Sequence, residues 1–110
     1  PDMVGHTGNI EATVKAIEAV DECIGKIFKQ CKNYGYSLIL TSDHGNAENM
    51  FDEKKNIVCT THSLNLVPFT ICEKINYSIK TGKLADIAPT VLKLLGLEIP
   101  IQMRGKPLIK

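Results

Sequence analysis

The sequence has few aromatic residues, almost no net charge and no long apolar run, and each absence excludes a class of protein. Aromatic residues make up 5% of the chain, and tryptophan is absent. The formal net charge is +1, from 13 basic and 12 acidic residues, so we expect no basic surface for nucleic acid or acidic membranes. No apolar run approaches the roughly 18 residues that a membrane-spanning helix needs. We therefore predict no nucleic-acid partner and no membrane span.

The cysteines lack the spacing of a zinc or redox motif. No two of the four cysteines form a C-x-x-C pair; they are Cys23, Cys31, Cys59 and Cys72. Cysteines placed in this way are typical of reduced, mostly buried thiols in a cytosolic protein. We therefore predict free thiols and no zinc site built from them.

The chain begins with Pro1-Asp2, without a methionine or a lead-in to a first structural element. We interpret this start as a cut within a longer polypeptide, so the absence of a targeting segment is uninformative. The 110 residues are enough for one modest domain, and a hydrophobic content of 44% can form its core.

The first third of the chain has helical periodicity. Apolar residues recur every three or four positions after Asn9, which is a good N-cap, and Gly35 provides a stop. The pattern predicts a long amphipathic helix over Asn9–Asn33.

The apolar run Tyr36–Thr41 follows the expected helix and does not alternate with polar residues, as in a strand covered on both faces. A long helix before such a strand is half of a β–α–β unit, so we predict an α/β fold with a largely parallel sheet flanked by helices, whose first strand would precede Pro1.

Shorter elements are expected in the middle of the chain. Met50–Cys59 has a polar centre between apolar flanks, which predicts a loop or a short hairpin. Leu66–Cys72 is a second strand candidate, and Pro68 favours an edge or strand-start position there.

A second helix is expected near the end of the chain. Leu84–Leu95 has an apolar pattern, and with Asp86 as N-cap, Pro89 falls in the first turn, where its missing N–H costs nothing. The tail Ile101–Lys110 is expected to form a loop or a short edge strand.

Every histidine lies at the edge of an expected element, and two of the three have an aspartate within four residues. Asp2 and His6 are four residues apart, so their side chains can face the same point if the segment forms a helical turn. Asp43 and His44 follow the first expected strand at its C-terminal end, where open α/β sheets place ligands. His62 lies in a polar segment just before the second expected strand.

These five residues, taken one by one, are better explained as solvated carboxylates, surface histidines or turn caps. Together, their imidazoles and carboxylates suit Zn²⁺ or Mn²⁺ better than Ca²⁺, which prefers oxygen ligands. The set is too large for one tetrahedral zinc that keeps an open position, and too small for two closed sites. We therefore predict a two-metal site that lacks some of its ligands.

The serines beside these residues are weaker candidates. Ser42 and Ser63 show no base and orienting partner of the kind that activates a catalytic serine, so hydrogen bonding in turns is the expected role. No catalytic nucleophile is predicted within the chain.

Four segments of the chain carry a resemblance to a known family. In this order, "PDMVGHTGN", "TSDHGNAE", "TTHSLNLVPF" and "LADIAPTVLKLLGL" resemble the C-terminal part of the cofactor-independent phosphoglycerate mutases, which belong to the alkaline phosphatase superfamily. The D-x-x-x-H and D-H-G motifs are shared widely in that superfamily, whereas G-H-T-G with T-H-S-x-N-x-V-P-F narrows the match to the mutases. The resemblance implies that residues 1–110 form the C-terminal part of the metal-binding phosphatase-like domain, without its N-terminal part and without the transferase domain.

The resemblance also implies a ligand set. Asp2, His6 and His62 would ligate one divalent metal ion, and Asp43 and His44 would ligate a second. The metal is usually manganese, with zinc, cobalt and magnesium as alternatives. The family completes the second site with an aspartate and the nucleophilic serine, which come from upstream of this chain.

The function that the resemblance implies is that of a cytoplasmic, glycolytic and gluconeogenic isomerase, expected to be a monomer. Such an enzyme interconverts 3-phosphoglycerate and 2-phosphoglycerate, small phosphorylated hydroxy acids, through a phosphoserine intermediate and without 2,3-bisphosphoglycerate. Because the nucleophile and most substrate-binding residues are upstream, we predict that the chain alone is inactive. The alternatives are a phosphopentomutase or phosphatase of the same superfamily, or a non-catalytic metal-binding module; the residues after His62 favour the mutase over the phosphopentomutase.

Overall fold

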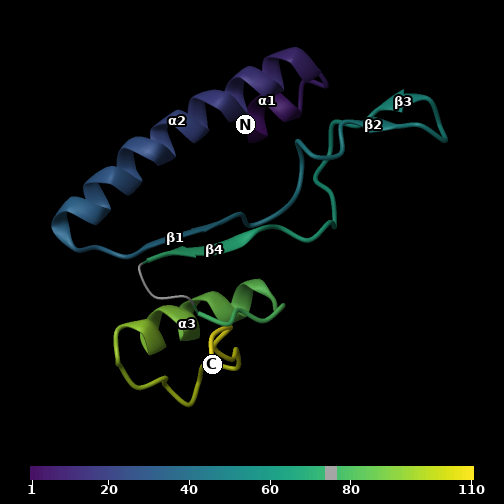
Figure 1. The fold of residues 1–110 in the computed structure, drawn as a ribbon. Coiled ribbons are helices and arrows are strands. Elements are labelled where there is room, and N and C mark those ends of the chain that lie inside the picture. Colours follow the sequence, from purple (N-terminus) through teal and green to yellow (C-terminus); the bar gives the residue numbers. More distant parts are fainter. Residues whose placement is uncertain (74–76) are drawn as a thin grey trace. The chain divides into compact units, whose positions relative to one another are not determined.

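The computed structural model of the chain describes residues 1–73 and 77–110 and has a mixed α/β fold (Figure 1). Two compact units make up the chain, Pro1–Glu73 and Lys74–Lys110. The candidate metal ligands all lie in the first unit. Among the described residues, no helix has the length and apolar character needed to cross a membrane.

The long helix α2 spans Ile10–Tyr34, which confirms the helix predicted over Asn9–Asn33. Asn9 caps its start, because the Asn9 side-chain oxygen accepts a hydrogen bond from the backbone N–H of Ala12 at 3.0 Å. Gly35 ends the helix with φ 72°, a left-handed conformation that glycine adopts at little cost. Local signals therefore determine both ends of α2.

Little apolar surface is buried in the first unit. Met50 is buried, whereas Leu38 and Ile39 in the first strand are only half-buried, so that strand is not covered on both faces as expected. The apolar face of α2 is exposed at Ile10, Val14, Ile17, Val20, Ile27 and Phe28.

The prediction of a largely parallel sheet is wrong. Strand β1, Leu38–Thr41, pairs with β4, Phe69–Cys72, and the two strands run antiparallel with Leu38 opposite Cys72 and Thr41 opposite Phe69. β4 begins one residue after Pro68, in agreement with the expected strand-start position. The described strands form two-stranded sheets only, β1 with β4 and β2 with β3.

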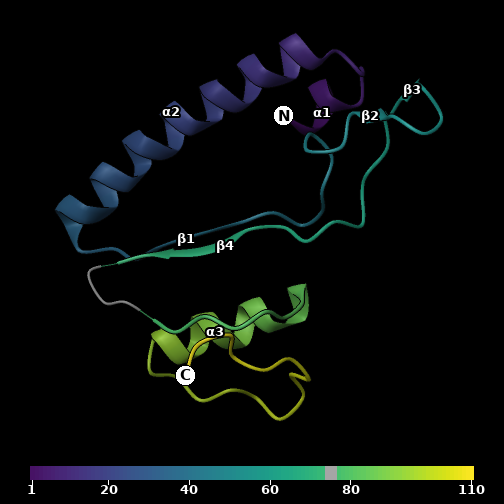
Figure 2. The same ribbon diagram turned by 45° about the vertical axis from the view of Figure 1, so that its right-hand side comes forward.

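The antiparallel direction follows from the path of the chain. The chain leaves β1 at Thr41, makes its loops beyond that end of the strand, and enters β4 at Phe69 from the same end (Figures 1 and 2). A parallel partner would require a crossover back to the start of β1. The helical and apolar patterns that predict α2 and β1 carry no information about the direction of a partner strand.

A short hairpin extends from these loops, as predicted for Met50–Cys59. β2, Phe51–Asp52, pairs antiparallel with β3, Ile57–Val58. The Asp52 carboxylate organises the turn by accepting hydrogen bonds from the backbone N–H groups of Lys54 and Lys55. The four cysteines, all within the described part of the chain, are unpaired thiols as predicted. The expectation that they are mostly buried is wrong, because Cys23 is exposed and the other three are half-buried.

The second unit contains the predicted second helix. The segment Leu84–Asp86 (η1) is a 3-10 turn, and α3 spans Ile87–Leu94 with Pro89 in its first turn. The tail returns to pair at a single bridge between Ile79 and Ile109, which agrees with the expected short edge pairing.

Asp86 is the N-cap residue of α3, as predicted, but its side chain makes no capping hydrogen bond to that helix. The carboxylate instead accepts hydrogen bonds from the backbone N–H groups of Lys106, at 2.8 Å, and Lys83, at 2.9 Å. Thr90, fully buried, adds a parallel link by donating to the Asp86 carbonyl and accepting from the N–H of Leu108. Asp86 therefore joins the start of α3 to the tail.

We expect Asp86→Asn to make the second unit less stable at neutral pH and less sensitive to acid. The N–H donors of Lys106 and Lys83 hold the pKa of the Asp86 carboxyl below its usual value. A carboxyl with a lowered pKa stabilises the fold fully above its unfolded-state pKa, and this contribution is lost as the pH falls through the folded-state pKa. The wild type should thus lose stability below about pH 4, and the variant should lose less. Denaturant unfolding at several pH values measures the pH dependence of stability for wild type and variant. The same pH dependence in wild type and Asp86→Asn would contradict the prediction. The control is Asp21→Asn, at an exposed position of α2.

Candidate metal centre

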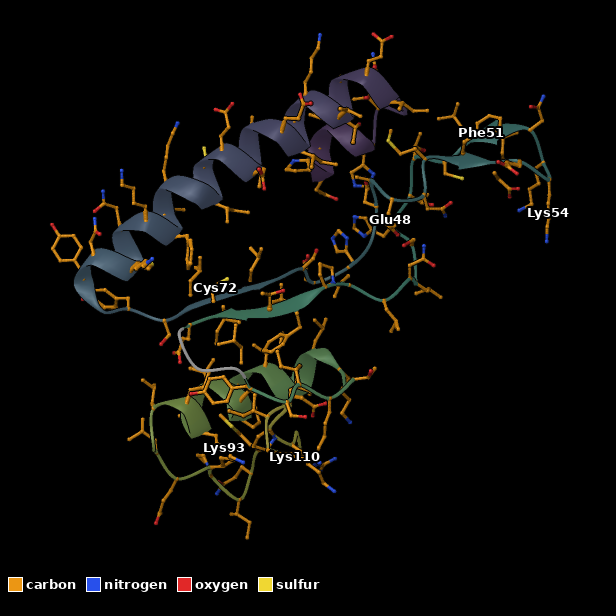
Figure 3. All side chains as sticks on the ribbon, viewed as in Figure 1. Glu48, Phe51, Lys54, Cys72, Lys93 and Lys110 are labelled. Carbon is orange, nitrogen blue, oxygen red and sulfur yellow. The ribbon has the colours of Figure 1, made fainter. Side chains whose placement is uncertain are left out.

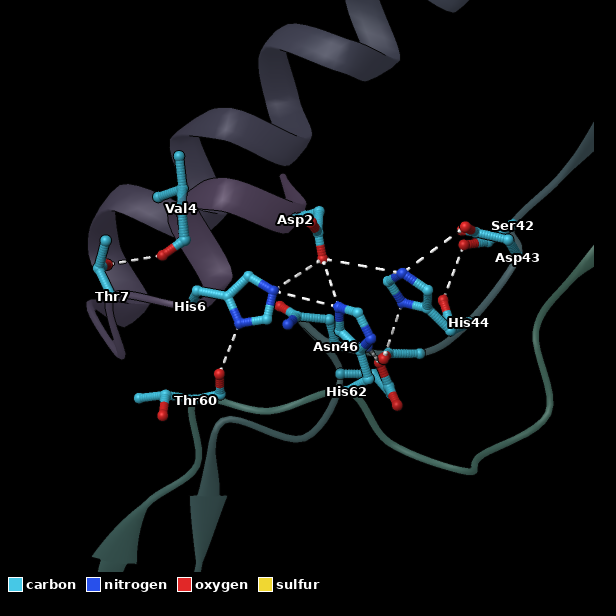
Figure 4. A network of polar contacts seen from close by, with 12 residues as sticks. Asp2, Val4, His6, Thr7, Ser42, Asp43, His44, Asn46, Thr60 and His62 are labelled. Atoms are coloured by element: carbon cyan, nitrogen blue, oxygen red, sulfur yellow. Dashed lines mark hydrogen bonds and ion pairs between the residues drawn. The ribbon is translucent and has the colours of Figure 1, made fainter.

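The short helix α1, Asp2–Gly5, brings Asp2 and His6 onto one side of the chain (Figure 4). The His6 Nε2 lies 3.3 Å from Asp2 Oδ1, as the helical spacing of the two residues predicts. The helix lies beside the start of α2 and packs through Gly5 onto Asn46. A Cβ at position 5 would collide with Asn46 Oδ1, so the buried Asn46 side chain would have to move if residue 5 were not glycine.

The other candidates lie in the two loops at one end of the β1–β4 pair. Asp43 and His44 follow β1, and His62 lies in the segment that leads back to β4. A backbone bridge joins the two loops, in which the N–H of Ser63 donates to the carbonyl of Gly45 at 2.8 Å. The antiparallel path of the chain thereby brings the histidines of both loops together.

Three ligand atoms from these segments form a nearly equilateral triangle. The Nε2 atoms of His6 and His62 are 3.1 Å apart, and they lie 3.3 and 3.2 Å from Asp2 Oδ1. Atoms bound about 2.0–2.2 Å from one metal ion at octahedral or tetrahedral angles are about 3.0–3.5 Å apart. The spacing of Asp2, His6 and His62 therefore fits a shared divalent cation, and these three residues are the group that could hold a metal ion among the described residues.

A hydrogen bond to the opposite ring nitrogen of His6 orients its Nε2 toward this triangle. His6 Nδ1 lies 2.6 Å from the carbonyl oxygen of Thr60, and since a carbonyl only accepts, Nδ1 carries the proton. His44 Nδ1 lies 3.3 Å from the carbonyl oxygen of Gly45, so His44 Nδ1 also acts as the donor. Metal-ligating histidines typically donate their second ring N–H to a carbonyl or carboxylate. A histidine ring held in this orientation can present its Nε2 to a metal ion.

His44 and Asp43 lie at the margin of the triangle. The His44 ring stacks on His62, with ring centroids 3.5 Å apart and an interplanar angle of 19°. His44 Nε2 is 4.0 Å from Asp2 Oδ1 and 3.7 Å from Asp43 Oδ2. The Asp43 side chain is 81% exposed, against 54% for Asp2. All five predicted residues thus meet in one place, but three form a tight group and two a looser one.

The neighbouring hydroxyls hydrogen-bond within the loops, as expected for turns. Ser42 Oγ donates to the His44 carbonyl at 2.8 Å, and Ser63 Oγ donates to the carboxylate of Glu48. The Ser63 donor is the main cause that lowers the pKa of Glu48 to about 2. Sequence reasoning gave Glu48 no role, although it lies only four residues after His44 in the quoted segment "TSDHGNAE".

Comparison with known proteins gives a consistent result over nearly the whole chain. Residues 1–99 match the family model of the metalloenzyme superfamily. The chain is 53% identical, over 98% of its length, to the 2,3-bisphosphoglycerate-independent phosphoglycerate mutase of Ehrlichia ruminantium (strain Gardel). It is 54% identical over its whole length to the mutase of the same name from Gracilaria tenuistipitata var. liui, and 51% identical over 99% to that of Wolbachia pipientis wMel. The chain spans 22% of the length of each of these relatives.

Proposed function

The chain belongs to the metalloenzyme superfamily, and we propose that it supplies part of the metal centre of an isomerase that interconverts 3-phosphoglycerate and 2-phosphoglycerate. The similarity to the relatives named above supports the proposal, because their names describe them as phosphoglycerate mutases that are independent of 2,3-bisphosphoglycerate. The observation that carries the proposal is the triangle of Asp2 Oδ1 with the Nε2 atoms of His6 and His62.

In this proposal Asp2, His6 and His62 hold one divalent cation. Asp2 contributes a hard anionic oxygen and the histidines contribute neutral nitrogens, a mixed set that suits Mn²⁺ or Zn²⁺. Manganese is our first choice, with zinc, cobalt and magnesium as alternatives. The side chains are 39–54% exposed, so an ion can reach them from solvent.

Asp43 and His44 would hold a second cation, more weakly. Of the described residues, only these two would contribute to it, and their ligand atoms lie 3.7 Å apart. We propose that an aspartate and a serine from outside the 110 residues complete this site. The stacking of His44 on His62 would keep the two ion positions close.

The residues of this chain have positioning roles in the proposed reaction. The Thr60 carbonyl fixes the tautomer of His6, and the Gly45–Ser63 bridge holds the loops that carry His44 and His62 together. When bound, a pair of divalent cations would acidify an attacking hydroxyl and offset the charge of the transferring phosphoryl group. The substrate would be a small phosphorylated hydroxy acid. A cytoplasmic location and a monomeric state stay predictions of the family resemblance.

A metal titration tests the proposed centre. We expect the chain to bind one Mn²⁺ more tightly than any second, because three of the five ligand atoms form the triangle. Asp2→Asn should weaken the tighter site by more than the about 10–100-fold that loss of a ligand's hydrogen-bond partner costs, because Asp2 is the only carboxylate of the triangle. Isothermal titration calorimetry of the wild type, Asp2→Asn and the exposed control Asp21→Asn provides the comparison. Equal Mn²⁺ binding by all three proteins would refute the assignment.

A further inference from the structure

Glu48 forms a hydrogen-bonded connection between the two loops that carry the candidate ligands. It lies in the segment between β1 and β2 (Figure 3). Its Oε1 accepts hydrogen bonds from Ser63 Oγ and from Asn65 Nδ2, the latter at 3.0 Å. Its Oε2 accepts from the backbone N–H of Asn46 at 2.7 Å. One carboxylate therefore has donors from both loops.

The donors are adjacent in sequence to the candidate ligands. Ser63 directly follows His62, and Asn46 is two residues after His44. The bridge between Ser63 and Gly45 lies beside the carboxylate, so the side-chain and backbone links act on the same pair of segments. A change at Glu48 would leave the Gly45–Ser63 bridge as the remaining link beside His62, so His62 could shift relative to His44.

The same connection extends to α1. Asn46 is 8% exposed, and its side chain packs against Gly5, where a Cβ would displace it. Since Glu48 holds the backbone N–H of Asn46, it also fixes the surface on which α1 lies. Asp2 and His6 are carried by that helix, so all three ligands of the triangle depend on this loop.

The connection requires an ionised carboxylate. Three donors converge on two oxygens, and the Ser63 hydroxyl holds the pKa of Glu48 at about 2, so the group is charged at neutral pH. A glutamine has one acceptor oxygen, and its NH₂ group would face one of these donors without being able to accept. Aspartate keeps the charge, but its shorter side chain cannot reach both loops.

We propose that Glu48 is a positioning residue, which holds His62 and the segment after His44 at metal-binding distance. The inference rests on the proposed metal centre. Glu48 would not bind the ion, and its function would be to form the triangle of ligand atoms before the metal arrives. Preorganised ligands bind more tightly because the cost of ordering them is met during folding.

The test compares Mn²⁺ binding by the 110-residue chain and three variants. Glu48→Gln should bind Mn²⁺ about 10–100-fold more weakly, the range observed when the partner of a metal ligand is removed. Glu53→Gln, which removes the same charge from an exposed position in the β2–β3 turn, should bind as the wild type does. Glu48→Asp separates position from charge: a positioning role predicts weaker binding, whereas a purely electrostatic effect predicts wild-type binding, which would overturn the proposal.

A spectroscopic measurement separates positioning from a general loss of stability. The visible absorption of bound Co²⁺ reports its coordination, so Glu48→Gln should change this spectrum in protein that far-UV circular dichroism shows to be folded. An unchanged spectrum with unchanged Mn²⁺ affinity would overturn the proposal.

If Glu48→Gln does not fold, two other variants test the same connection. Ser63→Ala and Asn65→Ala each remove a single donor to Glu48, and both should weaken Mn²⁺ binding. Wild-type affinity in both variants would overturn the proposal. A wild type that binds no Mn²⁺ would instead reject the metal centre itself.

Discussion

His62→Ala should lower mutase turnover by at least about 100-fold in an enzyme built around this chain, while the fold is retained. A suitable enzyme is a chimera in which the chain replaces the segment that it matches in the Ehrlichia ruminantium mutase. The substitution removes a ligand atom that lies 3.2 Å from Asp2 Oδ1 and 3.1 Å from His6 Nε2. It also removes the ring on which His44 stacks, so both proposed ion positions lose support. The loss should therefore exceed that of any change to a hydrogen-bond partner alone.

The assay follows conversion of 3-phosphoglycerate to 2-phosphoglycerate in buffer with limiting Mn²⁺. Tyr34→Ala is the control, because it removes an exposed ring at the end of α2, remote in sequence from the candidate ligands. Thermal unfolding of each chimera shows whether the fold is retained. Turnover of His62→Ala within a few-fold of the parent chimera would mean that His62 has a structural role only.

The 110-residue chain alone should give no measurable conversion of phosphoglycerate, even with saturating Mn²⁺. Its serines near the site are poor nucleophiles: Ser42 Oγ donates to the His44 carbonyl, which is no base. Ser63 Oγ donates to Glu48, whose pKa of about 2 makes it a very weak base. The chain also contains a single arginine, Arg104, so it cannot surround a phosphate with guanidinium groups. Loss of a nucleophile alone can remove nearly all of an enzyme's rate acceleration.

The chain and the chimera are assayed side by side at equal concentration. We expect turnover from the chimera only, which would locate the missing catalytic groups outside the 110 residues. Turnover by the chain within a few-fold of the chimera would mean that a nucleophile lies in this segment. Ser63→Ala and Ser42→Ala would then identify it.

Local structure could be predicted from the sequence because its causes are local. The N-cap Asn9 and the left-handed Gly35 determine the ends of α2 within a residue or two of the expected positions. The polar centre of Met50–Cys59 predicted a loop or a short hairpin, and the structure has the β2–β3 hairpin there. The direction of the β1–β4 pair was not predictable in this way, because strand pairing depends on contacts about 30 residues apart.

In the candidate site, too, the residues with local sequence signals were predicted and those with long-range partners were not. Asp2, His6, Asp43, His44 and His62 were found because each lies at the end of an expected element, and ends of elements meet at the same edge. Glu48 was missed because its partners are Ser63 and Asn65, 15 and 17 residues away, and no local pattern connects them. The Thr60 carbonyl was also missed, because every residue has a backbone carbonyl and the sequence does not show which one accepts a hydrogen bond.

The most direct measurement of the central claim is an anomalous-scattering map from crystals of the chain grown with Mn²⁺. We predict a manganese peak within about 2.3 Å of Asp2 Oδ1 and of the Nε2 atoms of His6 and His62. This position would show that the three residues bind one ion together. A bound manganese that leaves these three atoms without a metal contact would contradict the account.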